Sequence, residues 1–187
     1  PHVESPAPRI LDVGCGTGAN LLWLRELGPA FGLDQSEDAI RFAQERKLEN
    51  LQRGSAEHLP FSDQSFDGVA LIDVLYHEWV QDEVRVLQEV HRVLKPGGWL
   101  LFNDSASRLL ISSHDQFVMG KRRYAQNEVA DLMKTANFQV KQLSYWNFLL
   151  FPAILAARAL TRRRSPKTSV GRVPAPLNHF LYALLYF

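Results

Sequence analysis

Several features that often stabilise or anchor a small protein are scarce in this chain of 187 residues. It has a single cysteine, Cys15, which excludes a framework of disulfide bonds. The His and Cys residues do not follow the spacing of metal ligands, so we expect no metal site. No signal-peptide pattern precedes the first apolar run, and we therefore expect a cytoplasmic protein.

Acidic residues are missing from the last part of the chain. All twenty lie at or before Asp131, whereas residues 132–187 contain eight Lys or Arg. The net charge of +1 therefore hides an acidic first part and a basic last part. Basic and aromatic residues in the last part are not interleaved as a platform for single-stranded nucleic acid requires, so we expect no nucleic-acid partner.

The chain does contain short apolar runs that alternate with amphipathic helical patterns. This alternation predicts an α/β fold: a Rossmann-like, doubly wound, mostly parallel sheet with helices on both faces. Strands are expected near 9–13, 30–33, 50–53, 67–72, 98–103 and 138–145. Helices are expected near 19–27, 37–47, 81–94 and 126–136, with Ser36 as the N-cap of the second helix.

The first apolar run leads directly into a glycine-rich turn, Asp-Val-Gly-Cys-Gly-Thr-Gly at 12–18. Glycine permits a positive φ at such a turn and lets a ligand approach the backbone. Asp34 ends the next apolar run, twenty positions after Gly14, where a carboxylate can accept hydrogen bonds from ribose hydroxyls. The turn predicts a nucleotide-binding βαβ unit.

The spacing of this turn argues against a dinucleotide. Its glycines follow G-x-G-x-G, whereas dinucleotide sites use G-x-G-x-x-G. Asp12 lies just before the turn, where its carboxylate would repel a pyrophosphate. The same carboxylate suits a ligand with positive groups, such as a sulfonium or an amino acid ammonium.

Later segments complete a family pattern. Gly54–Phe61 is followed by Ser65–Asp67, and Leu87–Gly98 precedes the fifth expected strand. With the glycine turn, and in this order and spacing, the chain resembles the class I S-adenosylmethionine-dependent methyltransferases. The segments around His114, at 121–124 and at 144–152 are similar to a methyltransferase-domain 11-like bacterial subgroup of small-molecule type.

The resemblance implies S-adenosyl-L-methionine as cofactor and S-adenosyl-L-homocysteine as product. The glycines would approach the methionine part, Asp12 would orient its amino group and Asp34 would hold the ribose. Ala56 and Glu57 would flank the adenine, and Ser55 stands where the family often has Asp, which removes charge assistance from adenine recognition. The implied cofactor-binding residues are Asp12, Gly14, Cys15, Gly16, Gly18, Asp34, Gln35, Ser55, Ala56, Glu57 and Asp73.

His77 and Asp73 follow the fourth expected strand, where the family places residues beside the methyl group. His77 is the candidate general base because imidazole titrates near neutral pH; the alternative is a structural histidine that packs this loop. Asp73 would orient the methionine end or the acceptor, or else cap the following helix. We expect Cys15 to fill a small space at the turn and not to act as a nucleophile.

Four residues are candidates for the acceptor pocket: Tyr76, His114, Arg123 and Tyr124. Arg123 belongs to the basic run 121–123, which would bind an anionic acceptor such as a phosphate or carboxylate. The alternative is a solvated basic turn before the helix near 126–136.

Residues 1–145 are expected to form the cofactor-binding domain and residues 146–187 a helical extension of the same domain. The extension begins with an apolar run at 146–160 and continues with Arg162–Arg164. At fifteen residues, this run is short for a transmembrane helix. It predicts a cap over the site or a homodimer interface; the alternative is peripheral membrane contact, with the arginines on anionic headgroups.

The expected function is methyl transfer to a small-molecule or lipid-like acceptor. The alternative is a cofactor-binding scaffold or regulatory protein without turnover. This alternative stays open because Ser55 stands where the family often has Asp. An NAD-dependent enzyme is disfavoured by the glycine spacing and Asp12. A base-methylating enzyme is disfavoured because no Asn/Asp-Pro-Pro-Tyr-type signature follows the fourth strand.

Overall fold

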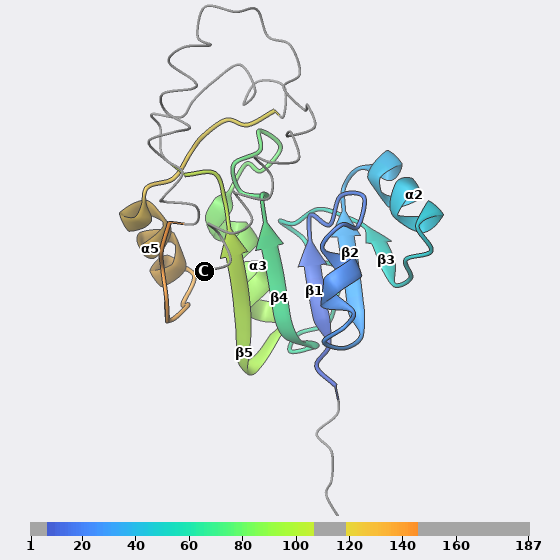
Figure 1. Cartoon of the computed structure of the whole chain (residues 1–187). Coiled ribbons are helices and arrows are strands. Elements are labelled where there is room, and N and C mark those ends of the chain that lie inside the picture. Colours follow the sequence, from blue (N-terminus) through green and yellow to red (C-terminus); the bar gives the residue numbers. More distant parts are fainter. Residues whose placement is uncertain (1–6, 107–118, 146–187) are drawn as a thin grey trace, which may run out of the picture.

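The structure of the protein is a computed structural model that describes residues 7–106 and 119–145. Five parallel strands form one sheet in the order β3-β2-β1-β4-β5 (Figure 1). Their bounds are Ile10–Val13 (β1), Ala30–Asp34 (β2), Leu51–Arg53 (β3), Phe66–Ile72 (β4) and Leu94–Asn103 (β5). This topology confirms the Rossmann-like, doubly wound prediction. The extension at 146–187 and His114 lie outside the described residues.

Helices cover both faces of the sheet. They are α1 (Leu21–Leu24), α2 (Glu37–Glu45), α3 (Glu83–Val93) and α5 (Gln126–Thr135). Because side chains alternate along a strand, Leu11 and Val13 join a core that includes buried residues of α3 and α5. Ile10 points to the opposite face and packs with Leu24 of α1. The alternation of the buried strand residues therefore explains the two helical layers.

The helix boundaries follow local hydrogen bonds. Ser36 caps α2 as predicted, because its hydroxyl accepts from the backbone N of Ala39 at 3.2 Å. α1 is shorter than the expected helix at 19–27. After Leu24 the chain tightens into turns with i to i−3 hydrogen bonds, such as Leu27 N to Leu24 O at 3.0 Å.

The prediction of a strand at 138–145 was wrong. The apolar residues of this segment alternate with polar ones, but Val140 and Leu143 are exposed and the segment contains no strand. Its start belongs to the end of α5, where Asn137 has a positive φ of 64° and Phe138 N donates to Met133 O at 2.8 Å. Alternation predicts a strand only where a neighbouring strand offers a ladder and a core.

β5 also begins earlier than expected. Leu94 pairs with Phe66 and Trp99 pairs with Gly68, so 95–98 form an irregularity inside the strand. Gly97 adopts a φ of 80° there, as glycine does in a bulge. Pro96 and the two glycines thus bend the strand instead of preceding it.

Candidate active site

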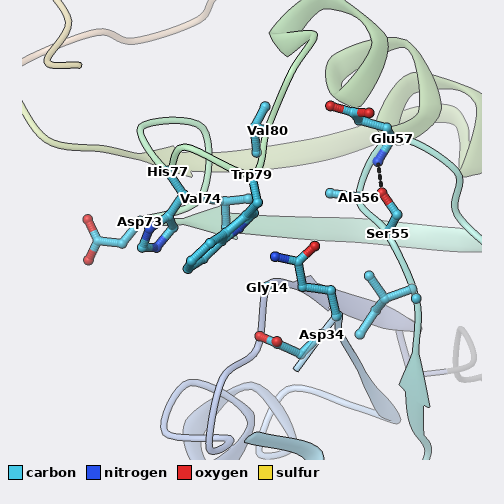
Figure 2. Close-up of a pocket in the computed structure, with 13 residues that line it drawn as sticks. Gly14, Asp34, Ser55, Ala56, Glu57, Asp73, Val74, His77, Trp79 and Val80 are labelled. Carbon is cyan, nitrogen blue, oxygen red and sulfur yellow. Dashed lines mark hydrogen bonds between the residues drawn. The ribbon is translucent and has the colours of Figure 1, made fainter. Parts of the chain in front are cut away.

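A pocket lies at the carboxyl ends of the strands, beside β1 and β4, where the strand order reverses (Figure 2). Ligands of open α/β sheets bind at this position. The lining residues come from the end of β2 and from the loops after β1, β2, β3 and β4: Gly14, Leu33, Asp34, Gln35, Gly54, Ser55, Ala56, Glu57, Asp73, Val74, His77, Trp79 and Val80.

The glycine turn owes its shape to two different constraints. A Cβ at Gly14 (φ 73°) would lie 2.5 Å from Cγ2 of Val74, so only glycine fits between these loops. At Gly16 (φ 53°) a Cβ would meet no atom within 4 Å. The backbone of Gly16 is therefore held in a left-handed conformation beside open space, where a ligand can approach it.

Asp34 connects the end of β2 to the glycine turn. Its Oδ2 accepts a hydrogen bond from Gly16 N at 2.8 Å, and its Oδ1 accepts one from Ser36 N at 2.8 Å. Each carboxylate oxygen has a second lone pair, so the same group can still accept from two hydroxyls of a ligand in the pocket. The carboxylate is thus oriented before any ligand binds.

Asp12 is fully buried beneath the turn. Neither carboxylate oxygen has a hydrogen-bond partner of good geometry within the described part of the chain, although the Asn20 side chain lies near enough to stabilise the carboxylate. Burial raises the pKa of Asp12 to about 7, with the nearby Asn20 side chain lowering it and the charge of Asp34 raising it further. A buried carboxylate without a partner is costly, and a cationic ligand group would relieve that cost.

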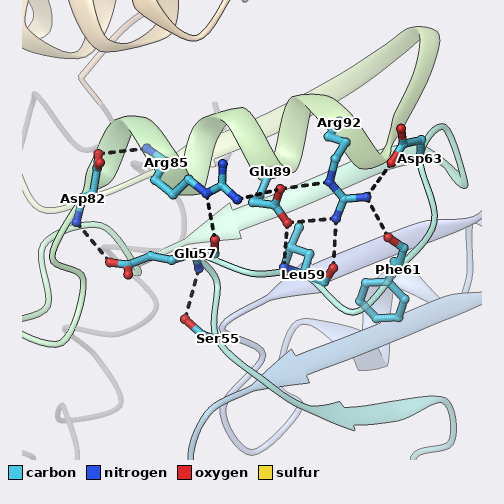
Figure 3. Close-up of polar contacts among 9 residues, drawn as sticks. All are labelled: Ser55, Glu57, Leu59, Phe61, Asp63, Asp82, Arg85, Glu89 and Arg92. Carbon is cyan, nitrogen blue, oxygen red and sulfur yellow. Dashed lines mark hydrogen bonds and ion pairs between the residues drawn. The ribbon is translucent and has the colours of Figure 1, made fainter.

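The loop after β3 forms the opposite wall. The Ser55 hydroxyl accepts from Glu57 N at 3.2 Å, so its acceptor capacity is partly used within the loop. The Glu57 carboxylate reaches toward the residues just before α3. Its Oε1 accepts from Gln81 N at 2.6 Å and from Asp82 N at 3.0 Å (Figure 3). Ala56 and the backbone of Glu57 remain on the side of the pocket.

Asp73 and His77 lie together after β4. Asp73 has a φ of 57°, and its N donates to Asn103 O at 2.9 Å, which joins the ends of β4 and β5. Burial raises the pKa of Asp73, and the charge of His77 counteracts that rise. The His77 ring is stacked between Tyr76, at 4.2 Å, and Trp79, at 4.0 Å between ring centroids.

Some predicted site residues lie away from the lining. Tyr76 and Tyr124 are buried, and the Tyr124 hydroxyl donates to Leu75 O at 3.0 Å. Arg123 donates from Nη1 to Ala106 O at 2.9 Å. Cys15 is also buried, and burial raises the pKa of its thiol to about 12.

The basic run 121–123 is not a simple solvated turn. Lys121 Nζ lies 3.5 Å and Arg122 Nη1 3.1 Å from the Glu83 carboxylate. Lys121 also donates to the backbone O of Val80. The first two cations of the run therefore tie this segment to the start of α3.

Sequence reasoning missed two neighbours of His77 and the cap of α3. Trp79 and Val80 line the pocket. The sequence could have indicated Trp79 as a site residue, because it follows Tyr76 and His77 in the same loop. The cap is Asp82, whose carboxylate accepts from Arg85 N at 2.9 Å. Asp73, the alternative cap suggested from the sequence, precedes α3 by nine irregular residues.

The comparisons with known proteins agree with this geometry. A family profile described as "Methyltransferase domain" matches residues 11–102, the segment from β1 to β5. A solved S-adenosylmethionine-dependent methyltransferase from Thermotoga maritima superimposes with a TM-score of 0.61 at 29% identity, over 73% of this chain and 66% of that one. The chain belongs to the class I S-adenosylmethionine-dependent methyltransferases.

Curated methyltransferases are similar over the same region. Phthiotriol/phenolphthiotriol dimycocerosates methyltransferase 1 of Mycobacterium ulcerans is 38% identical over 68% of this chain and 49% of its own length. Fatty-acid O-methyltransferase of Mycolicibacterium smegmatis is 41% identical over 54% of this chain and 38% of its own length. This chain thus spans about half, or less, of the length of these two curated relatives.

Proposed function

We propose that this chain carries the catalytic core of an S-adenosylmethionine-dependent methyltransferase that acts on a small-molecule or lipid-like acceptor. The observation that carries the proposal is the pocket, where Gly14, Asp34, the 55–57 loop and His77 converge from four separate strand ends. Two curated relatives, one named for a dimycocerosate lipid and one for a fatty acid, support the acceptor class.

The residues present fit the proposed cofactor. A Cβ at Gly16 would meet no atom within 4 Å, so the backbone there would be open to the methionine part. The buried carboxylate of Asp12, just before this turn, would suit an amino acid ammonium. Asp34 would accept from the ribose hydroxyls, with Gln35 beside it, and Ala56 would pack on the adenine. When bound, this cofactor supplies an electrophilic methyl group on a sulfonium.

The protein then contributes mostly alignment, because the donor is already activated. An acceptor that loses a proton also needs a base, and we assign this role to His77, which lines the pocket beside Asp73. Stacking by Tyr76 and Trp79 restricts the imidazole ring to one plane. Tyr124 and Arg123 would act behind the acceptor pocket, as supports for its wall.

A substitution of His77 distinguishes a general base from a histidine with a structural role. His77→Gln is expected to slow methyl transfer to a fatty acid or phenolic lipid at least tenfold, while the affinity for S-adenosylhomocysteine stays within about twofold, because only the base is lost. Unchanged turnover in the variant would return His77 to a packing role.

Calorimetry tests the cofactor. We expect binding of S-adenosylmethionine and S-adenosylhomocysteine and none of NAD. Binding of NAD alone would overturn the proposal. Cofactor binding without transfer to any lipid or small-molecule acceptor would favour the scaffold alternative.

The cytoplasmic location, the peripheral membrane contact and the homodimer are still predictions. A cytoplasmic location is supported by a free, buried cysteine, which suits a reducing compartment. Within 7–106 and 119–145, no helix has the length and apolarity to cross a membrane. Peripheral membrane contact and a homodimer were predicted from 146–187, outside the described residues.

A further inference from the structure

One partly buried ion pair on α3 holds the loop that forms a wall of the pocket. Glu89 is 6% exposed. Its Oε1 accepts from Arg92 Nε at 2.9 Å and its Oε2 from Arg92 Nη2 at 2.8 Å, in a two-pronged pair (Figure 3). Hydrogen bonds from Arg92 keep the pKa of Glu89 below its usual value, so the pair is ionised at neutral pH.

Both members of the pair also bind the loop backbone. Glu89 Oε2 accepts from Leu59 N at 2.8 Å, and Arg92 Nη2 donates to Leu59 O at 2.9 Å. Arg92 Nη1 donates to Phe61 O at 2.8 Å and to Asp63 Oδ1 at 2.7 Å. With the two bonds to Glu89, all five N–H groups of the guanidinium have an acceptor.

This loop has little regular structure of its own. Residues 54–65 contain no helix and no extended strand, so side chains replace the ladder that would otherwise hold the backbone. Leu59 is buried and lies two residues after Glu57. Ser55, Ala56 and Glu57 line the pocket. A shift of Leu59 would therefore move the wall expected to contact the adenine.

We propose that Glu89 and Arg92 are positioning residues for the nucleoside end of the cofactor site: they set the place of the 55–57 loop and with it the discrimination of the base. This proposal rests on the proposed function. Neither side chain lines the pocket, so both act through the loop. Lysine cannot replace Arg92, because it lacks the planar fork that serves three carbonyl or carboxylate partners on the loop and two oxygens of Glu89.

The first test needs no cofactor. Amide hydrogen exchange in Arg92→Lys is expected to be at least about tenfold faster at 55–61 than in the unsubstituted protein, with β1 and β2 unchanged, because local opening follows local contacts. Arg41→Lys is the matched control, since Arg41 forms an exposed pair with Asp38 on α2. Unchanged exchange at 55–61 would overturn the proposal.

The second test uses the ligand. Affinities are measured for S-adenosylhomocysteine and for S-inosylhomocysteine, which differs only in the base. Arg92→Lys and Glu89→Gln should weaken the first about tenfold, the equivalent of one hydrogen bond, and the second much less. A purely structural role would lower the melting temperature and leave the ratio of the two affinities intact, and that result would overturn the proposal.

A second variant and the hydrogen-exchange measurement distinguish failure of this proposal from failure of the proposed function. If Arg92→Lys does not fold, Asp63→Asn loosens only the outer contact of the guanidinium, and a smaller change in the same direction is expected. If the unsubstituted protein binds neither ligand, the proposed function fails, while hydrogen exchange at 55–61 still decides whether the pair holds the loop.

Discussion

At the scale of single residues, Asp34 has two tasks that a substitution would remove together. It orients the glycine turn through Gly16 N and offers its remaining lone pairs to the pocket. We expect Asp34→Ala to weaken S-adenosylhomocysteine binding by roughly 1–3 kcal/mol, through the loss of charge-assisted hydrogen bonds. Calorimetry would measure this, with Asp38→Ala, exposed on α2, as the control that keeps normal affinity. Normal affinity in Asp34→Ala would exclude a ribose-binding role.

Asp12 makes the stability of the ligand-free protein depend on pH. Its pKa is raised from 3.8 to about 7, so the folded chain binds this proton more tightly than the unfolded chain does. The contribution of Asp12 to the free energy of unfolding therefore decreases as pH rises from about 4 to about 7. Above pH 7 the full cost applies, at most about 4 kcal/mol for a shift of this size.

The matching substitution is Asp12→Asn, which keeps the shape and removes the charge. We expect a higher melting temperature than for the unsubstituted protein at pH 8, and a difference that shrinks toward pH 5. The same variant should bind S-adenosylhomocysteine more weakly, because the buried carboxylate would pair with the ligand's ammonium. Equal melting curves at pH 8 would mean that the charge of Asp12 is compensated. Asp104, whose pKa burial also raises to about 7, stays in place in both proteins.

At the scale of elements, the glycine turn can be tested against a second turn of the same conformation. Gly16 and Gly97 both have a positive φ, and a Cβ at either position would meet no atom within 4 Å. We expect Gly16→Ala and Gly97→Ala to lose a similar free energy of unfolding, about 1–2 kcal/mol for a left-handed alanine. Only Gly16→Ala should also weaken cofactor binding. Equal affinity in both variants would place the ligand away from the turn.

The elements also show what could be predicted from sequence. β1, β2 and β4 are central strands with apolar runs bounded by turn residues, and such runs identify buried parallel strands. The segment 138–145 has the alternation of a strand, but no strand within 7–106 and 119–145 pairs with it. Local pattern predicts an element well where the tertiary context agrees with it.

The site likewise contains features that local sequence predicts and features that depend on tertiary packing. Gly14, Asp34 and the 55–57 loop follow strands directly, so their meeting at one edge could be predicted from the order of strands and turns. The link from Glu57 to Gln81 and Asp82, and the one from Arg92 to Leu59, join residues at least 24 positions apart. Such links depend on packing between α3 and the loop. The family pattern at Gly54–Phe61 and Leu87–Gly98 contains Glu57, Leu59 and Arg92, but it does not say which of their atoms meet.

At the scale of the whole molecule, charge is separated along the chain, with no acidic residue after Asp131. If 146–187 contacts membranes, sedimentation with anionic vesicles should occur at low salt and weaken at high salt. Replacing Arg162–Arg164 with Gln should reduce it, whereas replacing the exposed Arg25, Arg46 and Lys47 with Gln should not. No sedimentation at low salt would remove the membrane hypothesis and leave a cap or homodimer interface.

The buried thiol of Cys15 has a consequence for self-protection. Thiolates are strong nucleophiles toward alkylating agents, whereas protonated thiols react slowly. The pKa of Cys15 is raised to about 12, so almost none of it is thiolate at neutral pH. A methyl donor held by this turn would be an alkylating agent, and the one thiol of the chain, which lies in the same turn, is protonated at neutral pH. The turn would thus combine access for the donor with resistance to methylation of the protein itself.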